Sequence, residues 1–186
     1  MFNTLANVQA LVESGSPRAP EVLKSLIAYL RAAMPRLHEA QATIGNEVTL
    51  VRSYLELMQM RMPDRLRFVI DINLALHGEY LPGMALLTLV ENAVRHGIDP
   101  SEDGGQIVVG ARRDASATLT FWVADSGIGL SNSAVLGHDG STGTGTGLAN
   151  LRSRLDASFA GRARLALTEV QPHGLRAEII IAPIDA

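Results

Sequence analysis

The spacing of hydrophobic side chains in the first third of the chain is typical of packed helices. Residues 2–14 and 20–33 have a helical pattern, and Pro20 suits the first turn of the second of these helices. From residue 39 to residue 62 the apolar positions follow one another in steps of four and three, as in a helix-packing seam. We expect this seam to pack against a neighbouring helix or, as the favoured interpretation, against a second copy of the chain. Its members are Ile44, Val48, Val51, Leu55, Met58 and Met62.

Beyond Pro63 the pattern changes to one that mixes strands and helices. Apolar residues alternate from Leu66 to Ile72, which is typical of a strand, and other alternating segments follow between helical ones. The order predicts an α+β layer of mostly antiparallel strands with helices on one face. We therefore divide the chain into a helical region, 1–62, and a second domain, 63–186. The predicted helices of this second domain are 82–96 and 148–159, and its predicted strands are 66–72, 105–113, 117–125, 163–170 and 176–183.

The composition of the chain excludes some classes of function but does not identify a particular one. The 186 residues are 47% apolar and 19% charged, which is enough for one domain or for a compact domain with a helical appendage. A net charge of −3 argues against a general nucleic-acid binder, and the lack of cysteine excludes disulfides and thiolate metal sites. No signal peptide is visible, and no stretch approaches the roughly 20 apolar residues of a membrane span. We expect a soluble, cytoplasmic chain, which leaves open that it belongs to a larger membrane protein.

A cluster of polar residues interrupts the apolar helix predicted at 82–96. Residues four apart share one face of a helix, so Asn92 pairs with His96 and Glu91 pairs with Arg95. One interpretation is the exposed face of an amphipathic helix with a weak surface ion pair. The other is a site, in which an amide oxygen binds a hard cation, a carboxylate acts as a base and two further groups bind phosphates.

Glycine-rich segments follow at two points of the chain. In "DSGIGL", Asp125 ends a strand, and Gly127 and Gly129 allow the backbone to turn close to a flat ligand. The acid can accept a hydrogen bond from an exocyclic amine, although a lone segment of this kind is usually only a turn.

The second segment, "GTGTG" at residues 143–147, precedes a helix. Glycines that expose N–H groups at a helix N-terminus favour an anion. A dinucleotide-binding fingerprint is excluded, because no strand comes directly before the segment, and a Walker loop is excluded, because no Lys-Ser or Lys-Thr follows. The alternative is a flexible linker.

Taken in order, these three segments resemble the N, G1 and G2 boxes of the GHKL ATP-binding fold. "LVENAVRHG", "DSGIGL" and "GTGLANLRSRL" are most similar to the LytS/YehU-like sensor histidine kinases. The helical segments follow the layout of that family too, so the resemblance covers nearly the whole chain. It implies an α+β fold: an N-terminal helical hairpin of the dimerisation type, then a GHKL (Bergerat) α/β sandwich whose mostly antiparallel sheet is covered on one face by helices.

The resemblance also implies a role for each residue of these boxes, with ATP and Mg²⁺ as the bound groups. Asp125 would hold the adenine amine, Asn92 would ligate Mg²⁺, and Glu91 would be the base that orients or deprotonates the incoming imidazole. Arg95 and His96 would face phosphate oxygens. The remaining nucleotide-binding residues would be Gly127 and Gly129 in the pocket floor and hinge, Gly143, Thr144, Gly145, Thr146 and Gly147 around the phosphates, and Leu148, Asn150 and Arg152 on the next helix.

Two further expectations concern the surroundings of the site. Residues 126–147 would form a lid over the nucleotide, which we expect to be mobile when no nucleotide is bound. Trp122, on the strand that leads to Asp125, is expected in the core, and its fluorescence would report nucleotide binding.

One departure from the family concerns the phosphorylated histidine. In the family it lies in a His-Phe-Leu-Phe-Asn motif, whose last two residues match Phe2 and Asn3, while Met1 stands at its leucine. The acceptor would therefore fall upstream of Met1, and the chain is expected to bind ATP without phosphorylating itself. His38 is the alternative acceptor. The implied partners are a response regulator receiver domain, of the LytTR type in this family, and a second copy of the chain that pairs through the N-terminal helices.

Two other functions stay open beside the histidine kinase. A GHKL ATPase or an anti-sigma-like serine kinase would share the boxes, but that kinase branch lacks a long paired-helix region. A non-catalytic dimerising scaffold would keep the fold, although the presence of Glu91, Asn92 and Asp125 does not suggest loss of activity.

Overall fold

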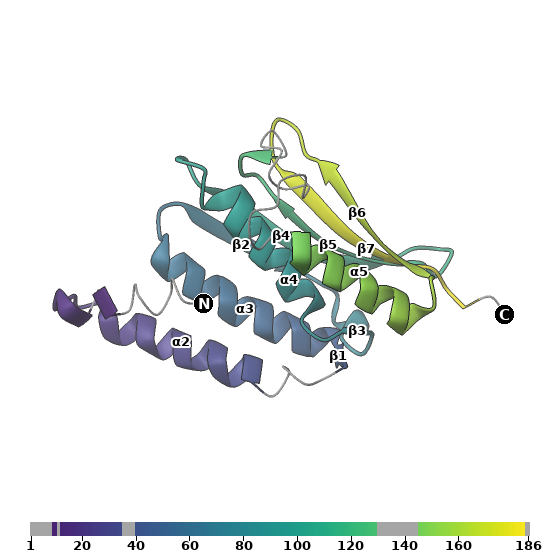
Figure 1. Cartoon of the computed structure of the whole chain (residues 1–186), viewed down its shortest axis with the longest axis horizontal. Helices are drawn as coiled ribbons and strands as arrows, with labels where there is room; N and C mark the ends of the chain where they lie inside the picture. The colour runs from purple at the N-terminus through teal and green to yellow at the C-terminus, as the bar shows by residue number, and fades with distance from the viewer. Residues whose placement is uncertain (1–8, 11, 35–39, 130–144, 185–186) are drawn as a thin grey trace.

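A computed structural model describes residues 9–10, 12–34, 40–129 and 145–184. These residues form a helical layer on one face of a five-stranded sheet (Figure 1), which confirms the predicted α+β class. The helices are α2 (Ala19–Ala33), α3 (Ile44–Arg61), α4 (Ala85–Asn92) and α5 (Gly145–Phe159), with the short turns η2 (Leu74–Leu76) and η3 (Ala93–Ile98). The strands are β1 (Gln41–Thr43), β2 (Leu66–Asp71), β3 (Tyr80–Pro82), β4 (Gly105–Arg113), β5 (Leu119–Asp125), β6 (Ala163–Glu169) and β7 (Leu175–Ile181).

The main sheet has the strand order β2-β4-β5-β7-β6. β2 pairs with β4 in parallel, and the other three pairings are antiparallel, as the sequence predicted for most of the sheet. β1 and β3 form a separate two-stranded ribbon that the sequence analysis did not predict. This ribbon lies beside the start of α3 (Figure 1).

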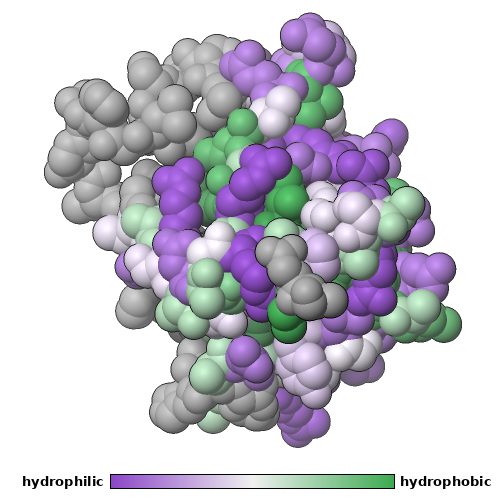
Figure 2. Space-filling view, turned by 90° about the vertical axis from the view of Figure 1, so that its right-hand side faces the viewer, coloured by the Kyte–Doolittle hydropathy of each residue, from purple (hydrophilic) through white to green (hydrophobic). Residues whose placement is uncertain are grey.

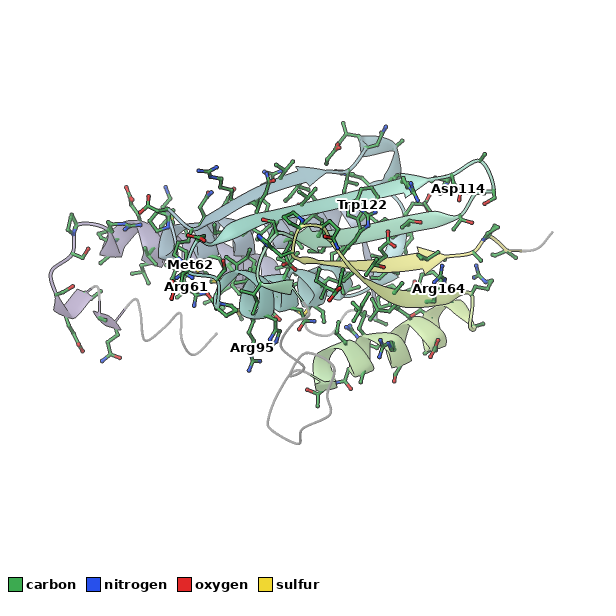
Figure 3. The ribbon with its side chains drawn as sticks, turned by 90° about the horizontal axis from the view of Figure 1, so that it is seen from above. Arg61, Met62, Arg95, Asp114, Trp122 and Arg164 are labelled. Carbon is green, nitrogen blue, oxygen red and sulfur yellow. The ribbon has the colours of Figure 1, made fainter. Side chains whose placement is uncertain are left out.

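Strand alternation decides which side of the sheet each residue of β5 faces. Phe121 and Val123 are buried under the helices. Trp122, between them, therefore lies on the opposite face, which corrects the expectation that it belongs to the core. The Trp122 ring packs beneath the guanidinium group of Arg176 at 4.5 Å, and Arg176 also forms an ion pair with Glu178 at 2.8 Å. Figure 3 shows Trp122 on the sheet, away from the helices.

The seam of α3 is buried within the chain itself. Ile44, Val51 and Leu55 are fully buried, and Met58 and Met62 nearly so. They belong to the same hydrophobic core as residues of α2, α4 and the sheet, because α3 lies between α2 and the rest of the molecule (Figure 1). The expectation that this seam pairs with a second subunit is therefore wrong, since its side chains are already covered.

The packing of α3 concerns the predicted division of the chain into two domains at residue 62. Its core is continuous with that of α4 and β2, and the β1–β3 ribbon joins residues on both sides of residue 62. The division at residue 62 stays a prediction, but no separate helical core marks it. Of the predicted first helix, residues 9, 10, 12 and 13 are helical, residue 14 is in a turn, and residues 2–8 and 11 lie outside the described residues. Within the described part of the chain, no helix combines the length and apolarity that crossing a bilayer requires.

The surface at the C-terminal end of the chain is mainly polar. Figure 2 shows this side of the molecule, where hydrophilic side chains predominate and hydrophobic ones are interspersed among them.

A buried carboxylate holds the start of α4. Glu47 is on α3 and has no exposed surface, and it accepts hydrogen bonds from the N–H groups of Met84 (2.7 Å) and Leu86 (2.9 Å). α4 has no cap from its own first residues, because the side chain of Met84 makes no capping bond. Glu47 therefore supplies the acceptors and the negative charge that a helix N-terminus favours.

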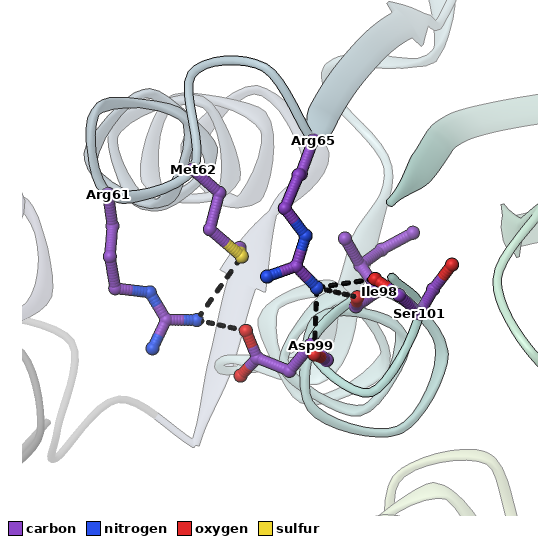
Figure 4. Close-up of polar contacts among 6 residues, drawn as sticks. All are labelled: Arg61, Met62, Arg65, Ile98, Asp99 and Ser101. Carbon is purple, nitrogen blue, oxygen red and sulfur yellow. Dashed lines mark hydrogen bonds and ion pairs between the residues drawn. The ribbon is translucent and has the colours of Figure 1, made fainter. Parts of the chain in front are cut away.

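An arginine holds the other end of the same helical segment. The guanidinium group of Arg65 donates to the carbonyl oxygens of Ile98 (3.3 Å), Asp99 (2.9 Å) and Ser101 (Figure 4). Arg61, one helical turn earlier, forms an ion pair with the carboxylate of Asp99. A cation at a helix C-terminus is favourable, so both ends of the segment 85–98 are held by charges from α3 and from the turn that follows it.

We predict that Glu47→Ala lowers the free energy of unfolding by about 2–4 kcal/mol, because two buried N–H groups lose their acceptor. Glu47→Gln keeps the shape of the side chain but turns an amide nitrogen toward one of the two donors, so we expect a smaller loss of about 1–3 kcal/mol. Urea unfolding followed by circular dichroism measures both variants.

The matched control is Glu56→Gln, which changes an exposed glutamate of the same helix. Its effect should stay within about 0.5 kcal/mol. A Glu47→Ala variant as stable as this control would show that the carboxylate does not hold α4.

Candidate functional site

The helix that carries the N-box residues changes its geometry in the middle of the box. It is α-helical up to Asn92 and then continues as the π-helical turn η3, in which the N–H of Asp99 reaches the carbonyl of Val94 at 2.8 Å. The predicted regular helix at 82–96 thus starts later, since Pro82 belongs to β3, and ends later. A π-turn widens the helix locally and is frequent at functional sites.

Beyond this turn the helix touches the end of β5 through glycine. A Cβ atom on Gly97 would lie 2.4 Å from Oδ1 of Asp125, and one on Gly127 would lie 2.1 Å from the carbonyl oxygen of Gly97. The N–H of Ile128 donates to that same carbonyl at 3.2 Å. The N box and the G1 box are therefore in direct contact, and a larger side chain at residue 97 or 127 would separate them.

Asp125 lies at the bottom of this contact. It is only 4% exposed, and its Oδ1 accepts a hydrogen bond from the N–H of Gly127 at 3.0 Å. Burial raises the pKa of its carboxyl group, while the N–H groups of Gly127 and Leu175 lower it and offset part of that rise. The carboxylate of Asp125 can therefore still accept hydrogen bonds, in surroundings that hold little water.

Two nitrogen atoms of the N box are buried without a hydrogen-bond partner among the described residues. They are Nδ2 of Asn92 and Nε2 of His96. Burial, and next the positive charge of Arg95, lowers the pKa of His96, so its ring is neutral at pH 7. Buried polar atoms normally find a partner, and these two therefore fit a site that binds a polar ligand.

Glu91 and Arg95 lie on the outer side of the same segment. Both residues are exposed, and Figure 3 shows Arg95 pointing away from the body of the molecule. The pKa of Glu91 is nevertheless raised by partial burial of its carboxyl group. Burial, followed by the charge of Glu91, raises the pKa of Tyr29 to about 12, and the same two causes come first in raising that of Tyr54. The two tyrosine rings pack 5.7 Å apart between α2 and α3, so Glu91 faces the helical region.

One pocket gathers residues from all three boxes. Asn92, His96, Asp125 and Leu148, which the sequence analysis named, line it together. Most of the apolar wall was not predicted from the sequence. Its residues come from the N-box helix, from β5 and from β6 and β7, and for the strands alternation was the only available signal. The residues that the sequence analysis did not name are Leu89, Ala93, Gly97, Val123, Leu167, Leu175 and Ala177.

Other predicted residues lie elsewhere or outside the described part. Gly143 and Thr144 are outside the described residues, as is most of the predicted lid. Gly145, Thr146 and Gly147 form the first turn of α5, which begins three residues earlier than expected. Asn150 is exposed, and Arg152 lies in a shallow groove with Asp156 and Arg164 rather than in the pocket. The structure thus brings the start of α5 to the pocket through Leu148, and Arg152 lies away from it.

α5 is attached to the helix of the N box at a second point. Nη1 of Arg154 donates to the carbonyl oxygen of Gly83, in the turn between β3 and α4. Its neighbours Leu151 and Leu155 are buried in the common core. The described start of α5 is therefore fixed relative to Asn92 and His96.

A divalent cation would find few protein ligands here. No group of three or more acidic, histidine or cysteine residues that could hold a metal ion occurs in the described part of the chain. Asn92 is the predicted ligand, and its amide lines the pocket with one atom unpaired. Mg²⁺ commonly binds through one or two protein oxygens plus phosphates and water, so this residue set fits a metal that arrives with a phosphate ligand.

Two family models match the chain in sequence. One, described as "Histidine kinase", covers residues 1–66. The other, described as "Histidine kinase-, DNA gyrase B-, and HSP90-like ATPase", covers residues 81–184 and with them the whole pocket. The second model alone spans more than half of the chain.

Two staphylococcal proteins are among its relatives. The chain is 32% identical to the sensor protein LytS of Staphylococcus saprophyticus, over 88% of this chain and 28% of that protein. It is 31% identical to the sensor histidine kinase/phosphatase LytS of Staphylococcus aureus, over 88% of this chain and 29% of the relative. The chain thus spans less than a third of the length of these curated relatives.

Solved structures of histidine kinases share the fold. The histidine kinase AdeS of Acinetobacter baumannii is similar with a TM-score of 0.57 and 17% identity, over 99% of this chain and 84% of that one. The histidine kinase domain of the blue-light activated kinase EL346 of Erythrobacter litoralis has a TM-score of 0.56 and 14% identity, over 98% and 84% of the two chains. At these identities the likeness supports the fold alone.

We predict that His96 titrates below its ordinary value of 6.5, because burial and Arg95 both disfavour the charged ring. The pKa of His96 is lower in the folded than in the unfolded chain, so the stability that the neutral ring contributes is present above pH 6.5. It is lost as the pH falls from 6.5 through the folded pKa. The ¹H–¹³C NMR signal of the ring, assigned with His96→Gln, gives the midpoint.

Arg95→Gln is the matched variant. It should raise the midpoint of His96 but leave it below 6.5, because burial is the larger cause and remains. A midpoint at or above 6.5 in the unsubstituted chain would contradict the described burial.

Proposed function

Because the chain belongs to the family of histidine kinase-, DNA gyrase B- and HSP90-like ATPases, we propose that it is the ATP-binding catalytic part of a LytS-like sensor histidine kinase. One observation carries the proposal. Asn92, His96 and Asp125 line a single pocket, and two of these three residues bring buried nitrogen atoms that have no partner among the described residues. The phosphate oxygens of a nucleotide are acceptors of the kind that such nitrogen atoms need.

The deep end of the pocket suits a purine base. Leu89, Val123 and Leu175 provide apolar walls, and Asp125 is the buried acceptor between them. A carboxylate in such a place selects a ligand that offers a donor, because the lack of one would leave the buried group unpaired. We assign Asp125 to the exocyclic amine of adenine. Gly127 lets the backbone approach closely, while Gly129, at φ +71°, provides the turn that follows.

The open end of the pocket suits phosphates and Mg²⁺. We assign Asn92 as the metal ligand and His96 as a neutral donor to phosphate oxygens. The positive N-terminal end of α5, where Gly145, Thr146 and Gly147 lie, favours an anion. Of the remaining predicted residues, Gly143 and Thr144 keep their predicted role around the phosphates, and Leu148 lines the pocket.

Phosphoryl transfer needs an aligned acceptor and a base at the rim. We assign the base to Glu91, since it is exposed toward the helical region and partial burial raises the pKa of its carboxyl group. An imidazole that approaches from the helical side would meet this carboxylate. Arg95, which is also exposed, would neutralise charge on the transferred group. Asn150 and Arg152 are further from this centre, and we propose no direct role for Arg152 at the phosphates.

The cellular setting is part of the same proposal. The histidine acceptor, the response regulator receiver domain of the LytTR type and the cytoplasmic location are proposed from likeness to proteins much longer than this chain. His38, the alternative acceptor, lies outside the described residues. Radiolabelled ATP tests whether these 186 residues phosphorylate themselves, and the prediction is that they do not.

A surface for a second copy is available on α2. Val22, Leu26 and Tyr29 pack on α3, whereas Leu23 and Ile27 on the other side of the helix are 43% and 44% exposed. We propose that this outer face, rather than the buried seam of α3, pairs with a second chain. The family model for histidine kinases spans this helix, and paired helices of this kind bury such an apolar stripe.

We predict that the chain binds ATP–Mg²⁺ in calorimetry and that Asp125→Asn weakens binding at least about tenfold. The amide would turn an N–H donor toward the donor of the base, a mismatch worth more than about 1.4 kcal/mol. Asn92→Ala should weaken binding of ATP with Mg²⁺ much more than binding without Mg²⁺. The control is Asp114→Asn, an exposed aspartate in the β4–β5 turn that should leave affinity unchanged. Unchanged affinity in Asp125→Asn would refute the adenine assignment.

We also predict that Ile27→Glu reduces self-association, because it would place a charge in the proposed apolar contact. Analytical ultracentrifugation of the chain at several concentrations should show a dissociation constant raised about tenfold or more. Glu102→Lys, an exposed change on the turn before β4, is the control and should leave self-association unchanged. If Ile27→Glu associates as strongly as the unsubstituted chain, the outer face of α2 is not the interface.

A further inference from the structure

The turn between β6 and β7 touches the G1 box from the side opposite the N box. Nδ1 of His173 lies 2.7 Å from the carbonyl oxygen of Gly127. Because a carbonyl oxygen only accepts hydrogen bonds, Nδ1 of His173 must carry the proton and donate it. None of the roles assigned above involves this histidine.

The contact holds one particular peptide group. The carbonyl of Gly127 and the N–H of Ile128 belong to the same planar peptide unit. His173 binds its oxygen, and the carbonyl of Gly97 accepts from its N–H at 3.2 Å. The unit is therefore fixed between the β6–β7 turn and the end of the N-box helix, and its rotation would break both bonds.

The same peptide unit adjoins the buried carboxylate. The N–H of Gly127, which belongs to the preceding peptide unit, donates to Oδ1 of Asp125 at 3.0 Å. The two peptide units meet at the Cα atom of Gly127, so a shift of that atom on loss of the bond from His173 would misplace the N–H that orients the carboxylate. The hydrogen bond from His173 thus acts on Asp125 through the backbone of Gly127.

The backbone of the β6–β7 turn packs closely against the end of β5, and this contact fixes the position of the turn. A Cβ atom on Gly174, whose φ is +129°, would lie 2.0 Å from the carbonyl oxygen of Asp125. A Cβ atom on Gly129 would lie 3.1 Å from the N–H nitrogen of Gly174. The turn is closed on itself by the N–H of Val170, which donates to the carbonyl of Gly174 at 3.1 Å. His173 is consequently presented to Gly127 by backbone that has little freedom to shift.

We infer that His173 is a positioning residue for the nucleotide pocket, which sets the orientation of Asp125 by holding the Gly127–Ile128 peptide. This inference rests on the proposed function, because it names a residue that tunes the adenine end of that site. His173 itself does not line the pocket, and it is an exposed residue. Its replacement should therefore change affinity while leaving the fold intact.

The expected result is that His173→Ala weakens ATP–Mg²⁺ binding about fivefold, the size of a lost hydrogen bond of about 1 kcal/mol. His173→Asn should restore affinity to within about twofold, because the amide nitrogen of asparagine can occupy the place of Nδ1 and donate. His173→Gln places its amide one atom further out and should stay weak. Calorimetry with ATP–Mg²⁺ measures all three variants, and thermal melting of each without nucleotide checks the fold.

A second measurement separates positioning of Asp125 from a general effect on the site. Inosine triphosphate has a carbonyl where adenine has its amine, so it lacks the exocyclic donor that we assign to Asp125. His173→Ala should weaken ATP much more than inosine triphosphate, and the ratio of the two affinities should therefore fall. Gln171→Ala, an exposed neighbour in the same turn, is the control and should change neither affinity.

The outcomes distinguish this inference from the proposed function. If the unsubstituted chain binds no ATP–Mg²⁺, the proposed function fails. If it binds but His173→Ala binds equally well, the inference alone is overturned. Equal losses in the alanine and asparagine variants, or equal losses for both nucleotides, would likewise overturn it, because either would show that the donor at Nδ1 does not act through Asp125.

Discussion

The structure depends on how one short helical segment is held at both ends. Residues 85–98 carry the N box, and opposite charges hold their two ends: Glu47 at the first turn and Arg65 at the last. Each charge has the sign that the helix end favours. Both come from α3 and the turn after it, so a single neighbouring element fixes the segment along its length. The polar residues of the site lie between these two points.

This arrangement explains why a site with unsatisfied groups can be built on the helix. The π-turn at 93–98 and the glycine contact at Gly97 bring the helix against the end of β5, where a regular helix with larger side chains would be kept away. A π-helical turn is less favourable than an α-helical turn, so without contacts to hold it the segment would return to the α-helical geometry. The hydrogen bonds from Arg65 to three carbonyl groups satisfy the end of that turn. The cation therefore stabilises the geometry that places Gly97 next to Asp125.

The sequence was sufficient to predict the fold class and to identify some residues of the candidate site. The physical reason for this success also explains what could not be predicted. Strand alternation and helix periodicity report which side of an element is apolar, and they located all five strands of the main sheet but not the β1–β3 ribbon. The boxes could be recognised because their chemistry is carried by residue type. Periodicity does not report what covers an apolar side, so the α3 seam was assigned to a second subunit although α4 and the sheet cover it. It also gave no role to Glu47 and did not predict Trp122 on the open face, because both depend on which tertiary partner lies opposite.

The polar groups of the pocket lower the stability of the protein without its ligand. The pKa of Asp125 is raised by burial, so its contribution to stability is present below its ordinary value near 3.8 and is lost as the pH rises through the folded pKa. At neutral pH its charged form is therefore unfavourable in the fold, and the unpaired nitrogen atoms of Asn92 and His96 are unfavourable as well. Such groups persist only where surrounding structure enforces them. Glu47, Arg65 and the glycine contacts supply that enforcement, and of these Glu47 and Arg65 lie outside the pocket lining. A ligand that pairs with these three polar side chains would remove these unfavourable contributions, so its binding would stabilise the folded state of this region.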